Sequence, residues 1–194
     1  IRDRGEGRVP WTLIHHLDPQ RAREICFNTE SWCGQTSEVA LSASSIVDYI
    51  DAAVEFCNER VWGTLACSII VHPKSLKDPA VAEAVERAIA NLRYGAIAVN
   101  HWSGLVYGLA TPTWGAFPGH ERNDIRSGRG VVHNTFMFDR PQKSVLRGPF
   151  RVFPWPTWFI DNDRAFAVGP KLTYFNADPS LARLPGLIWA SMFG

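Results

Sequence analysis

Four cysteines are the strongest nucleophiles in the sequence, and their spacing limits the chemistry they can do. Cys26, Cys33, Cys57 and Cys67 form no Cys-x-x-Cys pair and lie among apolar residues, as reduced thiols of a cytosolic protein would. Cys33 is the best candidate nucleophile, because it lies in a loop beside Gly34, where a backbone N–H can assist a thiolate. The alternative, which we favour, is a packed or incidental thiol.

The histidines and one loop invite a metal or a phosphate interpretation. His15 and His16 are adjacent, so on a strand they would point to opposite faces, and the sequence has no His-Glu-x-x-His motif or Cys/His cluster. Residues 126–130 read Arg-Ser-Gly-Arg-Gly, which resembles a phosphate-binding loop without its Lys-Ser/Thr ending. We expect no metal site, and we expect a flexible loop at 126–130.

Hydrophobic periodicity predicts the elements that must hold these side chains. From Ser45 onward, apolar residues at positions 46, 50, 54 and 57 fall on one helical face, and Ser45 with Asp48 resembles a capping box. The pattern predicts a helix that ends near Gly63. A nearly continuous apolar run at residues 65–71 then predicts a strand covered on both faces.

A second helix and a second buried strand follow. Asp78 and Pro79 supply an N-cap and a first-turn proline, and Gly95 lies just past the expected helix end. The apolar run at residues 96–99 is the next expected strand. The apolar stripe of the helix consists of Val81, Val85, Ile89 and Leu92.

Two earlier strands are expected at residues 12–16 and 39–41. Strands that alternate with helices in this way predict an α/β fold, namely a Rossmann-like parallel βαβαβ sheet with helices on both faces. In such sheets, ligands meet the loops beyond the carboxyl ends of the strands. The residues expected there are Ser42, His72, Asn100, His101 and Trp102.

Charge and hydropathy exclude several classes of partner. The 194 residues carry a formal net charge of +1, without the basic excess of a nucleic-acid-binding protein or a polybasic run for anionic lipid. The first eight residues contain no apolar signal region, and no run of about 18 apolar residues occurs. We therefore expect a soluble, cytoplasmic protein that binds no nucleic acid and does not contact membranes. Because the chain begins at Ile1 and not at methionine, we also expect a piece of a longer protein.

The composition changes near residue 149. We divide the chain into residues 1–148 and an aromatic-rich C-terminal extension at 149–194, which contains FPWPTWF and LPGLIWASMFG and is expected to be an extended arm. Such an apolar segment can dock on a partner subunit or lie at a membrane surface. Few basic residues flank it, which favours the protein interface.

Five short motifs occur in a meaningful order. They are Glu30-Ser31-Trp32-Cys33-Gly34, residues 48–58 with Ala52 and Ala53, Trp62-Gly63-Thr64-Leu65, Ala98-Val99-Asn100 and Trp114-Gly115-Ala116. Together they resemble the C-terminal portion of the catalytic domain of the aldehyde dehydrogenase superfamily, over roughly residues 11–149. The sequence departs from that pattern by one additional residue before Gly34, by Gln35 in place of a proline, and by an insertion before Ser127-Gly128.

The resemblance implies a function and a set of site residues. It implies part of an NAD- or NADP-dependent oxidoreductase that converts an aldehyde to a carboxylic acid, with the nucleophile and most of the nucleotide-binding domain outside this chain. No residue of the chain is then catalytic, Glu30 accepts hydrogen bonds from the cofactor ribose, and the C-terminal arm joins a homo-oligomer. The residues implied near the aldehyde, or alternatively packing residues of a loop, are Asn100, His101, Trp102, Leu105 and Tyr107.

Two other classes of function stay open. One is a non-catalytic, Rossmann-like interaction or oligomerisation module that kept the fold and lost the active site. The other is a small independent enzyme that uses Cys33 or His101.

Overall fold

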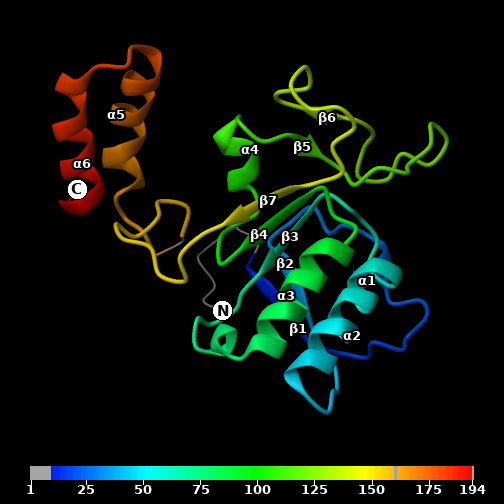
Figure 1. Cartoon of the computed structure of the whole chain (residues 1–194). Coiled ribbons are helices and arrows are strands. Elements are labelled where there is room, and N and C mark those ends of the chain that lie inside the picture. The colour runs from blue at the N-terminus through cyan, green and yellow to red at the C-terminus, as the bar shows by residue number, and fades with distance from the viewer. Residues whose placement is uncertain (1–9, 160, 194) are drawn as a thin grey trace. The chain divides into compact units, whose positions relative to one another are not determined.

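The computed structural model describes residues 10–159 and 161–193 (Figure 1). The chain divides into two compact units, Ile1–Gly148 and Pro149–Gly194. The boundary between them falls where the aromatic-rich extension begins in the sequence.

Unit 1 is built on a parallel sheet with the strand order β3–β4–β7, where β3 is Ala66–Ile69, β4 is Ala96–Val99 and β7 is Ser144–Arg147. All four residues of β4 are buried, as its apolar sequence and its two strand neighbours require. The strands predicted at residues 65–71 and 96–99 are confirmed. Strand β7 escaped prediction, because its four residues begin and end with polar side chains.

The two predicted helices are present with their predicted caps. Helix α2 spans Ile46–Glu59, and the Ser45 hydroxyl accepts a hydrogen bond from the Asp48 backbone N–H at 3.1 Å. Helix α3 spans Pro79–Asn91, and the Asp78 carboxylate accepts one from the Ala80 N–H at 2.9 Å. Each cap satisfies a donor that the first turn of a helix leaves without a partner.

The core of unit 1 lies between these helices and the sheet. Both helices contribute to it, so α2 and α3 cover the same face of β3 and β4, whereas the short helix α4, Leu105–Leu109, lies on the other side of the sheet (Figure 1). Full burial of one such aliphatic side chain stabilises the fold by about 1.5–3 kcal/mol. The central residues are Val85, Ile89, Leu92, Tyr94, Ile97 and Val99.

A second parallel pair stands apart from this sheet. Strand β1, Thr12–Leu17, pairs with β2, Gln35–Val39, in a separate two-stranded sheet. The short helix α1, Ile25–Asn28, lies between these two strands in the sequence. The strand predicted at residues 12–16 is confirmed, but the one predicted at 39–41 is wrong, because β2 begins and ends earlier. Its polar first residues join the strand through backbone pairing with β1, which an apolar pattern does not reveal. Since β2 does not pair with β3, the parallel strands form two sheets and not one continuous βαβαβ sheet.

A short antiparallel pair closes the amino end of β4. It consists of β5, Trp114–Gly115, and β6, Val131–Val132. A Cβ atom at Gly95 would overlap the carbonyl oxygen of Gly115, so glycine is required for this approach.

Unit 2 differs from the extended arm expected from the sequence. It contains α5, Ala165–Ala177, a 3₁₀ turn at Leu181–Arg183 and α6, Leu184–Phe193, and the two helices contact each other. The prediction was wrong because the prolines and glycines of this segment argue against helices, yet Pro170 lies inside α5. Within residues 10–159 and 161–193, none of the helices has the length and apolarity that a bilayer crossing needs.

Candidate functional site

Glu30 lies on a cavity of about 660 Å³ at the amino ends of β3 and β4, which we call the Glu30 cavity. Its walls come from α1, the loop before β2, the start of β2, the turn before β3, and a distant loop. Both aromatic and polar side chains line it. Its lining includes Phe27, Trp32, Thr36, Trp62, Tyr94 and Arg126.

The Glu30 carboxylate is available to a ligand. The residue is exposed, and no described residue forms a hydrogen bond or an ion pair with its side chain. Trp32 is also exposed, and its backbone is in the left-handed region (φ 49°). Two acceptor oxygens and a flat aromatic face therefore border the same space, which suits a ligand that has adjacent hydroxyl groups and a planar ring.

Glu24 fixes one wall of the cavity, and sequence reasoning missed it. Its carboxylate is buried, caps α1 by accepting from the Cys26 N–H at 3.3 Å, and pairs with Arg21 at 3.1 Å. Burial and the neighbouring Glu24 raise the pKa of the Cys26 thiol. The signal in the sequence was an acidic residue just before an apolar turn.

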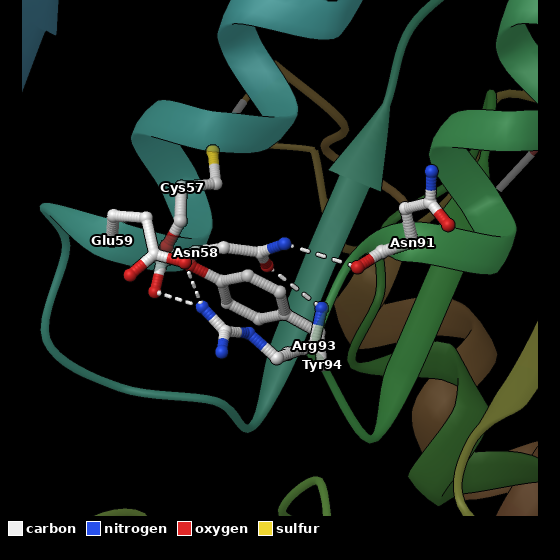
Figure 2. A network of polar contacts seen from close by, with 6 residues as sticks. All are labelled: Cys57, Asn58, Glu59, Asn91, Arg93 and Tyr94. Atoms are coloured by element: carbon white, nitrogen blue, oxygen red, sulfur yellow. Dashed lines mark hydrogen bonds and ion pairs between the residues drawn. The ribbon is translucent and has the colours of Figure 1, made fainter.

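Tyr94 forms another wall and belongs to a network at the ends of α2 and α3 (Figure 2). Its hydroxyl donates to the Cys57 carbonyl at 3.1 Å. The Asn58 side chain donates to the Asn91 carbonyl at 3.0 Å and accepts from the Arg93 N–H at 2.8 Å, and Arg93 also pairs with Glu59. These bonds satisfy carbonyls that the last turns of both helices leave unpaired, so they hold Tyr94 in place.

Arg126 and Ser127, from the loop at residues 126–130, also line the cavity, although this loop is distant in the sequence from the other lining residues. The Ser127 hydroxyl accepts a hydrogen bond from the Thr64 N–H at 2.8 Å, and the Gly128 N–H donates to the Ile125 carbonyl at 2.9 Å. This loop is therefore anchored to the turn before β3. The flexibility expected for this loop stays a prediction.

The residues assigned to the aldehyde side lie at the other end of β4. Asn100 follows β4 in the left-handed region (φ 58°), and its side-chain oxygen accepts from the Val71 N–H at 2.8 Å. Its own N–H donates to the Ile69 carbonyl at 2.8 Å. The side chain of Asn100 thus ties the ends of β3 and β4 together.

The neighbours of Asn100 divide between packing and exposure. The His101 ring lies so close to Gly148 that a Cβ atom there would overlap it, and Leu105 is half-buried in α4. Trp102 and Tyr107 are each more than half exposed. The Tyr107 ring lies 5.8 Å from that of Trp114 and 5.1 Å from that of His133.

The structure does not bring Glu30 together with these residues. A four-residue strand spans about 13 Å, and β4 separates the Glu30 cavity at its amino end from Asn100 at its carboxyl end. Trp102, Leu105 and Tyr107 share the carboxyl end. The predicted site is therefore two subsites on opposite ends of the sheet.

Three of the four thiols are held in the protonated form. Desolvation raises the pKa of Cys57, and it raises the pKa of Cys67 to about 11, with a further contribution from Cys57. Cys33 is exposed, and no described residue forms a hydrogen bond with its thiol. An activated thiolate needs a nearby cation or a base such as histidine, and in the described part of the chain no cation or histidine pairs with any of these thiols.

Metal ligation finds no support in the described part of the chain. His15 lies 2.8 Å from the Glu38 carboxylate, and no group of three His, Cys, Asp or Glu side chains converges there. Comparison with protein-family models, with curated proteins and with solved structures gave no match for this chain.

Proposed function

We propose that this chain is the C-terminal portion of the catalytic domain of an NAD- or NADP-dependent aldehyde dehydrogenase-like oxidoreductase. The observation that carries the proposal is the position of Glu30, whose exposed carboxylate has no partner within residues 10–159 and 161–193 and lies on a cavity of about 660 Å³. In the resembling family a glutamate in this sequence position accepts hydrogen bonds from the cofactor ribose. The order β2–α2–β3–α3–β4 also agrees with the motifs that carry the resemblance.

The Glu30 cavity fits the ribose half of such a cofactor. Its volume falls within the usual range for small-molecule sites, about 300–1,000 Å³. Trp32 and Trp62 border the cavity, and the two oxygens of Glu30 can accept from both ribose hydroxyls. When bound, a nicotinamide cofactor supplies the hydride acceptor for the oxidation.

The nucleophile of the reaction lies outside this chain in our proposal. An attacking thiolate must be formed at neutral pH, but the pKa values of Cys26, Cys57 and Cys67 are raised and not lowered. The chain would instead supply part of the cofactor site. Hydride transfer needs the aldehyde within about 3–3.5 Å of the nicotinamide, so the exposed rings of Trp102 and Tyr107, at the opposite end of β4, would not line the aldehyde in this proposal.

The finer features of fold, place and assembly are also proposals. We infer that β3, β4 and β7 belong to a Rossmann-like sheet in the longer protein, and that the protein is cytoplasmic, because all four cysteines are free thiols. We also infer a homo-oligomer. Exposed apolar side chains in unit 2, such as Phe166 and Leu181, support contact with a partner subunit.

The same exposed side chains favour a second candidate, a non-catalytic interaction module. A unit of 46 residues that buries few of its large apolar side chains gains stability by docking on another protein. This candidate predicts oligomers without cofactor binding, whereas the first candidate predicts oligomers and cofactor binding.

The experiment is an activity assay of the longer gene product that contains this chain. We expect aldehyde-dependent reduction of NAD or NADP, followed by absorbance of the reduced cofactor, and no activity from the 194 residues alone. In the longer protein, Glu30→Gln should raise the KM for the cofactor by about tenfold, with a smaller change in kcat. A longer protein without aldehyde-dependent activity, or an unchanged cofactor KM, would contradict the proposal.

A further inference from the structure

Arg126 borders the Glu30 cavity, although 96 positions separate the two residues in the sequence (126 − 30). The side chain comes from the loop that the sequence likens to a phosphate-binding loop. Glu30 and Arg126 carry opposite charges, yet the described residues include no ion pair between them. Glu30 and the part of Arg126 that Asp124 does not engage therefore border the same cavity.

The guanidinium of Arg126 keeps most of its donors. Its Nε donates to the Asp124 carboxylate at 3.0 Å, and no described residue accepts from its two terminal amino groups. One bond orients the planar group, while the terminal donors remain available. Such an arrangement suits bidentate binding of a phosphate or a carboxylate.

The backbone of the loop is fixed in an unusual conformation. Arg126 adopts a left-handed φ of 47°, and Gly128 has a φ of 123°. The Ser127 hydroxyl lies against the turn before β3, where it accepts from the Thr64 N–H and would be 3.5 Å from a Cβ atom at Gly63. Non-glycine residues in this region are strained, and in many proteins they cluster at ligand sites.

We propose that Arg126 binds the phosphate of a nucleotide whose ribose is held by Glu30, with Ser127 anchoring the loop. The acceptor oxygens of Glu30 match a diol, the guanidinium matches an anion, and the cavity holds the tryptophan faces against which a planar base can stack. A sugar that bears both a diol and a phosphate has this combination of groups. The choice of Glu30 as the ribose ligand rests on the proposed function, whereas the anion assignment rests on Arg126.

The test compares two ligands that differ only by the phosphate. Binding of nicotinamide mononucleotide and of nicotinamide riboside to the 194-residue chain is measured by isothermal titration calorimetry. We expect the mononucleotide to bind about tenfold more tightly than the riboside, because its phosphate adds charge-assisted hydrogen bonds to Arg126. Arg126→Ala should remove that difference and leave riboside binding unchanged, and Arg126→Lys should restore part of it.

Arg129→Ala is the matched control, because Arg129 belongs to the same loop and does not border the cavity. It should leave both affinities unchanged, and circular dichroism checks that every variant is folded. A mononucleotide preference that survives Arg126→Ala, or that Arg129→Ala removes equally, would overturn the proposal.

Two further results separate this proposal from the function proposed above. If Arg126→Ala removes the preference but Glu30→Gln leaves both affinities unchanged, the anion site stands and the ribose role of Glu30 fails. If a folded chain binds neither ligand, the anion site and the ribose role both fail.

Discussion

The two ends of β4 differ in how their polar side chains are used. At the carboxyl end, the Asn100 amide bonds to the Val71 N–H and joins two strands. At the amino end, Glu30 and the terminal donors of Arg126 have no partner among the described residues, and both border one cavity. The position expected to bind a ligand in parallel sheets thus contains a structural amide, while the Glu30 carboxylate and the terminal amino groups of Arg126 lie at the opposite end. Unsatisfied groups, more than topological position, identify the stronger binding candidate here.

We expect the largest loss of stability from a substitution at the centre of β4, between the two ends compared above. Ile97 is fully buried between both ends. Ile97→Ala should lower the free energy of unfolding by about 2–5 kcal/mol through lost burial and a residual cavity. Urea denaturation measures this change, and Ile70→Ala in an exposed position is the control, expected to change stability by less than about 0.5 kcal/mol.

Asn100 tests the structural role of the carboxyl end. Asn100→Ala should lower the free energy of unfolding by about 2–3 kcal/mol, because it leaves the Val71 N–H unpaired and places alanine in a left-handed conformation. Asn100→Gly tolerates the backbone and removes only the hydrogen bond, so its loss should be smaller. Equal losses for both substitutions would remove the conformational part of this explanation.

Cys67 gives a pH-dependent test of the core between α2 and β3. Its pKa is raised from 9.0 to about 11, so the unfolded chain loses the thiol proton at a lower pH than the folded one. The associated stability is fully present below pH 9 and is lost as the pH rises towards 11, by roughly 1–3 kcal/mol. Urea denaturation at several pH values should show a smaller decline in Cys67→Ala than in the wild type. The same decline in both proteins would exclude Cys67 as a source.

Glu30 should show the smallest effect on stability and thereby sharpen the contrast. Because its carboxylate has no partner among the described residues, Glu30→Gln should change the free energy of unfolding by less than about 0.5 kcal/mol. Thermal and urea unfolding measure this. A loss above about 1 kcal/mol would mean that Glu30 supports the fold, as Asn100 does.

The sequence predicts the elements whose signals are local. Ser45 and Asp78 mark the starts of α2 and α3, and continuous apolar runs mark β3 and β4. Strand β2 was misplaced because pairing with β1 decides its start, and the helices of unit 2 were missed because Pro170 argues against α5.

The candidate site was predicted only in part. Glu30 was found through its motif, but its cavity depends on contacts between distant segments. Ser127 reaches Thr64 across 63 residues, and no local pattern announces that contact. The place of Arg126 on the same cavity as Glu30 follows from it, so only a folded chain reveals that the two residues share a cavity.

The most direct test of the account is hydrogen–deuterium exchange of the 194-residue chain with and without NAD. We predict that NAD slows exchange at residues 29–37, 61–66 and 126–128, which surround the Glu30 cavity, and leaves residues 100–107 unchanged. Protection confined to residues 100–107, or no protection in either region at saturating NAD, would contradict the assignment of cofactor binding to the amino end of β4.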